Sequence, residues 1–147
     1  MTSAFPRGRP RRYVLDANAL IGFFEDREGT AGKIERLVDE ALRQDLPLLM
    51  SAVNWGEVFY TEWRYRGEAR AWEAEKNLLE MPIAVIAVDR ERASRAGALK
   101  QKHGLGYADA FAAELAIERG AWLVTADSEF QKVGKALSLY PLPRHEK

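Results

Sequence analysis

Residues 13–20 read YVLDANAL, a short β-prone run that ends at an aspartate and leads into a brief helix over residues 20–25. The same alternation continues along the chain. The spacing of apolar residues predicts helices over 31–44, 53–66, 68–80, 90–102 and 107–119, and strands over 48–50, 83–88, 121–125 and near Leu139. Because the strands are nearly all apolar, this order predicts an α/β fold of three layers, α/β/α, around a central parallel sheet of four to five strands.

The composition fits one folded domain, which we expect over residues 13–147. The chain has 147 residues, of which 47% are hydrophobic, enough to bury roughly 68–70% of the surface that its unfolded form would expose. It has no cysteine, which excludes a disulfide framework, a thiolate zinc site and cysteine catalysis. The two histidines are too few for a histidine-rich metal site.

The first twelve residues form a basic arm. They contain Arg7, Arg9, Arg11 and Arg12 and no acid, so the rest of this formally neutral chain carries a net charge of −4. We expect a flexible terminus, with contact to RNA phosphates or to a partner as the alternative. The arm lacks the apolar stretch of a signal peptide, and no run approaches the ~18 apolar residues of a membrane span. We therefore expect a cytoplasmic protein without membrane contact.

Four acids are expected to meet at one edge of the predicted sheet. Asp16 and Asp127 directly follow apolar strands, and Glu57 lies in the first turns of the helix after the second strand. Asp109 lies near the start of a helix that turns through Gly120 straight into a strand, so this helix and strand must be antiparallel. All four acids then lie at the carboxyl ends of the strands, where open parallel sheets bind their ligands.

Each of these acids alone has an ordinary interpretation as a helix cap, a turn residue or a solvated helix residue. Their shared edge favours a common role, because independent caps would scatter over both edges. Carboxylates gathered in a cleft repel one another and lose hydration, so four together imply a neutralising cation. Oxygen ligands suit Mg²⁺ or Mn²⁺, and these ions indicate action on phosphate.

Four motifs in order carry a resemblance to a known family: VLDANAL at 14–20, SAVNWGE at 51–57, GLGYADA at 104–110 and LVTADSEF at 123–130. The chain resembles PIN-domain nucleases, most closely the VapC toxins of toxin–antitoxin pairs. The resemblance implies a Mg²⁺- or Mn²⁺-dependent endoribonuclease that forms a homodimer and binds a cognate antitoxin. The chain differs from this family at one place: relatives can carry a further aspartate after the fourth motif, where this chain has Ser128 and Glu129.

The resemblance also implies roles for individual residues. The catalytic and metal-binding cluster would comprise Asp16, Glu57, Asp109 and Asp127, with Asn18 and Thr125 as polar support.

The substrate expected for an open acidic cleft is single-stranded or loop RNA, whose backbone and unstacked bases are accessible. Candidate phosphate contacts are Arg64, Arg66 and Lys102, and residues 63–66, WRYR, interleave aromatic and basic side chains. The alternative for this stretch is packed aromatics and solvated arginines.

Three other functions compete with the toxin. An aspartyl phosphatase of the haloacid-dehalogenase type needs a second acid two residues after the first, where this chain has Asn18. A receiver-type signalling module needs a lysine after a late strand, and residues 125–127, TAD, supply none. A PIN nuclease that matures RNA without being a toxin stays open, because only a neighbouring antitoxin gene would decide.

Overall fold

The computed structural model describes residues 10–144, so most of the basic arm, including Arg7 and Arg9, lies outside the described residues. The elements in chain order are β1 (Tyr13–Leu15), α1 (Ala17–Phe24), α2 (Thr30–Gln44), β2 (Leu48–Ser51), α3 (Ala52–Arg66), α4 (Glu68–Leu79), β3 (Ile83–Ile86), α5 (Arg90–His103), α6 (Tyr107–Arg119), β4 (Trp122–Thr125), the 3-10 helix η1 (Ser128–Ala136) and β5 (Ser138–Pro141).

The strands form one five-stranded sheet in the order β3-β2-β1-β4-β5, and every neighbouring pair is parallel. In the central strand, Val14 lies opposite Leu49 on one side and Leu123 on the other. This arrangement confirms the predicted parallel sheet of four to five strands. A parallel sheet aligns the carboxyl ends of all its strands along one edge.

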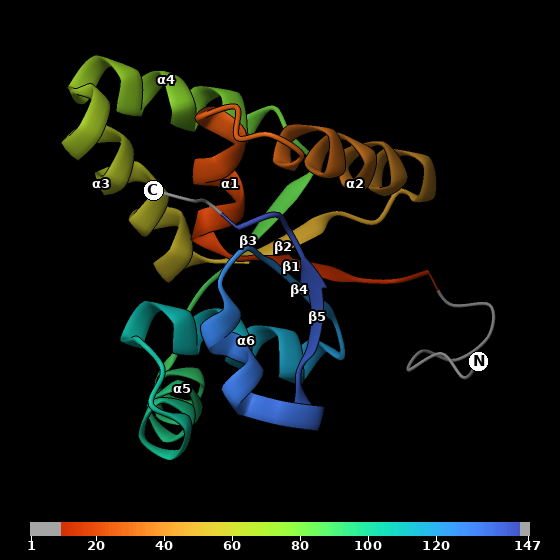
Figure 1. Cartoon of the computed structure of the whole chain (residues 1–147), viewed down its shortest axis with the longest axis vertical. Coiled ribbons are helices and arrows are strands. Elements are labelled where there is room, and N and C mark those ends of the chain that lie inside the picture. The colour runs from red at the N-terminus through yellow and green to blue at the C-terminus, as the bar shows by residue number, and fades with distance from the viewer. Residues whose placement is uncertain (1–9, 145–147) are drawn as a thin grey trace.

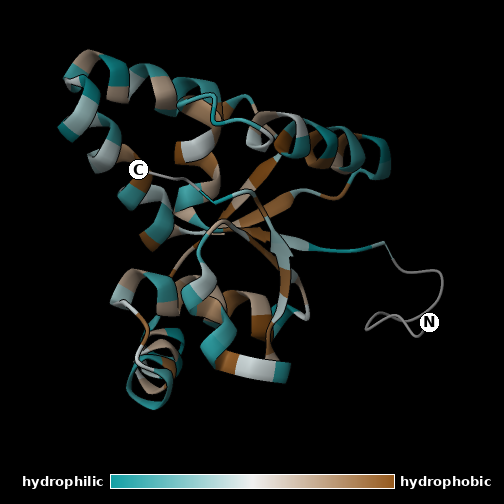
Figure 2. Cartoon of the chain, viewed as in Figure 1, coloured by the Kyte–Doolittle hydropathy of each residue, from teal (hydrophilic) through white to brown (hydrophobic). Residues whose placement is uncertain are grey.

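Helices cover both faces of this sheet, which confirms the three predicted layers (Figure 1). Side chains from α1 to α4 pack on one face around Leu20, Ile34 and Met50. Those of α5, α6 and η1 pack on the other around Phe111, Leu123 and Phe130. The strands of the sheet are coloured mostly as hydrophobic, while the helices around it carry both hydrophilic and hydrophobic residues (Figure 2). Among residues 10–144, no helix is long and apolar enough to cross a membrane.

The turn from α6 into β4 follows the prediction. Gly120 ends the helix in the left-handed region, at φ 59°, and the strand begins two residues later. Glycine adopts this conformation without the clash that a Cβ would cause. The reversal makes α6 antiparallel to β4 and brings the beginning of α6, with Asp109, to the carboxyl edge of the sheet.

Two local features were not anticipated from the sequence. The 3-10 helix η1 fills the stretch between β4 and β5, which the sequence pattern left without an element. In addition, the described end of the arm contacts the sheet: the Arg11 guanidinium lies 5.0 Å from the centre of the Trp122 ring, and the Arg12 carbonyl accepts a hydrogen bond from the Trp122 amide.

A buried ion cluster joins α5 to α6. Glu114, only 2% exposed, accepts hydrogen bonds from Arg92 at 2.9 and 3.1 Å and from Arg95 at 2.9 Å. Arg92 also pairs with the more exposed Glu118 at 3.0 Å. A charge this deeply buried is tolerated because both arginines neutralise it.

We predict that Glu114→Ala lowers the free energy of unfolding by about 3 kcal/mol, because Arg92 keeps a largely desolvated charge and loses its buried partner. The matched control Glu118→Ala removes an exposed partner of the same arginine and is expected to cost less than about 1 kcal/mol. Urea unfolding of both variants measures the difference. Equal losses would contradict a special contribution from the buried pair.

Candidate active site at the carboxyl edge of the sheet

Asp16 lies directly after β1, at the start of α1. Its Oδ1 accepts a hydrogen bond from the Ala17 amide at 2.9 Å and so caps α1. Its Oδ2 accepts a hydrogen bond from the Thr125 hydroxyl at 2.8 Å, which connects the ends of two neighbouring strands. The side chain is 1% exposed. Two donors on different elements therefore hold this carboxylate in one orientation.

Asn18 and Thr125 extend this network. The Asn18 amide nitrogen donates to the Thr125 hydroxyl at 3.3 Å, and its amide oxygen accepts from the Ala126 backbone at 3.0 Å. The Thr125 hydroxyl also accepts from the Asp127 backbone amide at 3.0 Å. The two polar residues named from sequence thus lie beside Asp16 and orient it.

Glu57 and Asp109 approach from the two helical layers. Glu57 lies in the second turn of α3, and Asp109 in the first turn of α6. Gly106, which precedes α6, leaves room for Asp109: a Cβ at this glycine would lie only 3.0 Å from the Asp109 Oδ2. A side chain at residue 106 would therefore displace the Asp109 carboxylate.

Asp127 has a local role as well as its place in the cluster. Its Oδ1 accepts a hydrogen bond from the Glu129 amide at 2.9 Å and caps η1. It also lies close enough to Asp109 to repel it electrostatically. Asp127 therefore has features of both roles considered from the sequence: it caps a turn, and it lies near another acid of the cluster.

Burial raises the pKa values of Asp16, Glu57 and Asp109, and neighbouring acids add to the shift of Asp16 and Asp109. Burial raises the pKa of Asp16 to about 8, helped by the charges of Asp109 and Glu57, while the Thr125 hydrogen bond opposes the shift. Burial and the charges of Asp127, Glu57 and Glu129 raise the pKa of Asp109 to about 6. The pKa of Glu57 is raised by burial. The structure thus brings the four predicted acids, and Glu129, into one electrostatic cluster.

The chemistry of this cluster fits a hard divalent cation, whose charge would relieve the repulsion that raises these pKa values. Oxygen is the only ligand type that the acids present. Within residues 10–144, however, no three Asp, Glu or His side chains lie close enough together to coordinate one ion. Asp16, Glu57, Asp109 and Asp127 would therefore have to move toward a cation in order to bind it jointly.

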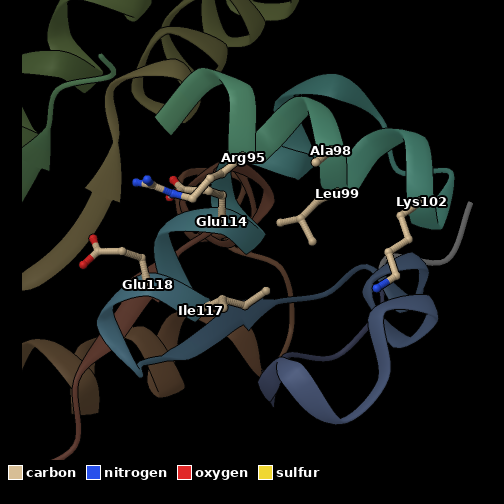
Figure 3. Close-up of a pocket in the computed structure, with 7 residues that line it drawn as sticks. All are labelled: Arg95, Ala98, Leu99, Lys102, Glu114, Ile117 and Glu118. Carbon is tan, nitrogen blue, oxygen red and sulfur yellow. The ribbon is translucent and has the colours of Figure 1, made fainter. Parts of the chain in front are cut away.

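Two of the candidate RNA contacts, Arg64 and Arg66, lie away from the acids along α3. Arg64 and Arg66 are in the last turn of α3, roughly 10 Å or more along the helix axis beyond Glu57 at ~1.5 Å per residue. Arg66 pairs with Glu62 at 3.5 Å. Lys102 lines a hollow of about 490 Å³ between α5 and α6, together with Leu99 and other residues (Figure 3). Arg64 and Arg66 are therefore not gathered around the acids, and contact with RNA stays a prediction for all three cations.

Two residues near the acids were missed from sequence. Asn54 is fully buried one turn before Glu57 and donates hydrogen bonds to Glu57 and to the Ala108 carbonyl. Gly106 is the other, because of its contact with Asp109. The three-residue spacing of Asn54 and Glu57 on one helix was the available signal for the first.

The chain matches the model of a known protein family. The model of the PIN domain matches residues 13–136. The chain belongs to the PIN domain family. PIN domains are nucleases, so this one belongs to a family of hydrolases that act on nucleic acid. No curated protein matches the chain in sequence.

Solved structures similar to this PIN domain confirm its fold. VapBC2 from Rickettsia felis, bound to a DNA fragment from the promoter, aligns with a TM-score of 0.69 at 19% identity, over 88% of this chain and 98% of that one. VapC20 from Mycobacterium tuberculosis, a toxin that cleaves the sarcin–ricin loop, aligns with a TM-score of 0.66 at 16% identity, over 83% and 95%. A toxin–antitoxin complex from Klebsiella pneumoniae gives 0.62 at 22%, over 85% and 94%.

The metal-free PIN domain is predicted to become less stable as the pH rises from 6 to 8. The folded-state pKa of Asp16 is about 8, above its ordinary value of 3.8, so between these values the native state binds more protons than the unfolded state. Stability therefore decreases as the pH rises through this window. Melting temperatures in EDTA buffers measure the trend. Asp16→Asn, which cannot ionise, should flatten it, and an identical slope in both proteins would contradict the role of Asp16.

Proposed function

We propose that this PIN domain is a Mg²⁺- or Mn²⁺-dependent endoribonuclease and the toxin of a VapBC-type pair. The observation that carries the proposal is the buried Asp16, held by Thr125 and surrounded by the acids of α3 and α6. Such a site is unfavourable without a cation, and it lies at the edge where open parallel sheets bind their ligands. Membership in the PIN family supplies the nuclease chemistry.

In this proposal the acids bind the cation, and Thr125 orients one of them. Asp16 and Asp109 would hold one or two divalent ions, Glu57 would complete the set of ligands, and Asp127, which follows β4, would support it. When bound, the cation would polarise the scissile phosphate and lower the pKa of a water toward hydroxide. Thr125 keeps the Asp16 carboxylate aimed at the edge while the ion is absent. The site requires no nucleophilic side chain: water would attack the phosphorus and the ribose 3′ oxygen would leave, so that hydrolysis gives 5′-phosphate and 3′-hydroxyl ends.

The proposed substrate is single-stranded or loop RNA, because an edge site accommodates a splayed backbone more readily than a duplex. The similar fold of VapC20, described as cleaving the sarcin–ricin loop, supports this choice of substrate class. Arg64, Arg66 and Lys102 stay as candidate contacts for RNA segments away from the scissile bond.

We propose that the chain binds an antitoxin, because several of the solved structures with a similar fold are toxin–antitoxin complexes. The α3–α4 pair also exposes large aromatic side chains, including Tyr60 at 58% and Trp72 at 53%. Apolar patches of this kind are typical of protein interfaces. We assign this face to the antitoxin or to the second subunit of a homodimer, both of which the toxin would meet in the cytoplasm.

The cleavage test compares wild-type protein with Asp16→Asn on total RNA in Mg²⁺, Mn²⁺ and EDTA, with the ends of each product mapped. We expect discrete cuts with either metal and none in EDTA. The cleavage activity of Asp16→Asn should be at least about 100-fold lower than that of the wild type, because the substitution removes the charge of the innermost carboxylate. Its side-chain oxygen can still cap α1, so its melting temperature in EDTA should equal or exceed that of the wild type. An active Asp16→Asn protein would refute the assignment.

The toxin assignment has a separate test. Expression of the chain in a bacterial host is expected to arrest growth, and co-expression of a small adjacent reading frame to restore it. The Asp16→Asn protein serves as the control, since it should be harmless yet still co-purify with the product of that frame. A chain that cleaves RNA but has no such adjacent frame would instead be an RNA-processing PIN nuclease.

A further inference from the structure

Asn54 links two of the acidic elements through one side chain. It lies in the first turn of α3 and is 0% exposed. Its amide nitrogen donates to the Ala108 carbonyl at 3.0 Å and to the Glu57 Oε1 at 3.4 Å. Ala108 is adjacent to Asp109 in the first turn of α6. A single amide group thus contacts one acid directly and the backbone beside another.

The orientation of this amide is determined by its partners. The nitrogen has two hydrogens, and both have an acceptor. Reversing the amide would place Oδ1 against the Ala108 carbonyl, which can only accept, and against the Glu57 carboxyl group. In the observed orientation Oδ1 is buried and has no hydrogen-bond partner among the described residues. An unpaired buried acceptor lowers the stability of the folded protein. The two hydrogen bonds of the Asn54 nitrogen are therefore made at the expense of an unsatisfied Oδ1.

The Ala108 carbonyl does not need Asn54 for folding. Inside α6 it already accepts the helical hydrogen bond from the next turn. The bond from Asn54 is therefore an additional one, and its effect is to fix the start of α6 against α3. Glu57 and Asp109, one on each helix, repel each other across this contact.

We propose that Asn54 is a positioning residue that sets the approach of Glu57 and Asp109 to one divalent cation. The inference rests on the proposed metal-dependent function. Its amide restrains the Glu57 carboxylate and ties α6 to α3, so the two helices that carry Glu57 and Asp109 cannot move apart under the repulsion of these acids. Since no three acids within residues 10–144 already form a complete ion site, this restraint determines how far each must move when the ion binds.

The test compares Asn54→Leu with Asn77→Leu, a matched change at an exposed asparagine of α4. Leucine has a similar shape but no donor, and it also removes the unpaired acceptor. The affinity of the full chain for Mn²⁺ is measured from the electron paramagnetic resonance signal of the free ion, and the melting temperature is measured in EDTA. We expect Asn54→Leu to bind Mn²⁺ about 10- to 100-fold more weakly, as for other residues that orient ligands, at a melting temperature close to that of the wild type.

A purely structural role would give the opposite pattern, with a lowered melting temperature and unchanged Mn²⁺ affinity, and would overturn the inference. Asn54→Ser is the second variant if the leucine protein does not fold: its short hydroxyl cannot make both bonds, so it should also bind Mn²⁺ more weakly. Wild-type affinity in a folded Asn54→Ser protein would overturn the inference in that case. Asn77→Leu is expected to match the wild type in both measurements.

The same experiment separates this inference from the proposed function. If the wild-type chain binds Mn²⁺ neither alone nor in the presence of a short single-stranded RNA, the metal-dependent function fails and the positioning role fails with it. If the wild type binds Mn²⁺ and Asn54→Leu binds it equally well, only the positioning role is refuted.

Discussion

The repulsion among buried and half-buried carboxylates at one edge of the sheet is the constraint on which the rest of this structure depends. Asp16 is buried among other acids and is held by only two hydrogen bonds, so its charge is unfavourable in the folded protein. A fold optimised for stability alone would place an apolar or neutral residue there. The apolar clusters on both faces of the sheet have to offset this cost, as functional sites commonly require.

The architecture concentrates this charge without disturbing the core. Parallel strands end together, and each acid is attached to a different rigid element: Asp16 follows β1, Glu57 lies on α3, Asp109 on α6 and Asp127 after β4. Their side chains meet at the edge, outside the layers in which the hydrophobic clusters pack. The repulsion therefore acts between elements that cannot separate without breaking that packing. This rigidity is what lets a few hydrogen bonds, such as those of Thr125, determine where the charges point.

Most of the fold followed from local patterns, whereas the detail of the site did not. The apolar strands, the helical spacing and the reversal at Gly120 are encoded within short windows of sequence, and chain direction alone places the four acids at one edge. The 3-10 helix after β4 was missed because its kink at Gly134 interrupts any helical period. Asn54 could not be assigned because its partner, the Ala108 carbonyl, is 54 residues away and meets it only when α3 packs on α6. The need for glycine at residue 106 could not be assigned either, because it depends on the direction in which the Asp109 carboxylate points.

The excess of negative charge also constrains how substrate and cation would bind in the proposed reaction. Clustered carboxylates repel a phosphodiester as well as one another, so RNA would bind weakly to the metal-free site. A cation removes both repulsions at once, and an RNA phosphate in turn adds an oxygen ligand to the ion. Binding of each therefore favours binding of the other, by the same factor in both directions. An ion site that is incomplete in the free protein is the expected consequence of this coupling, because the substrate itself contributes to its completion.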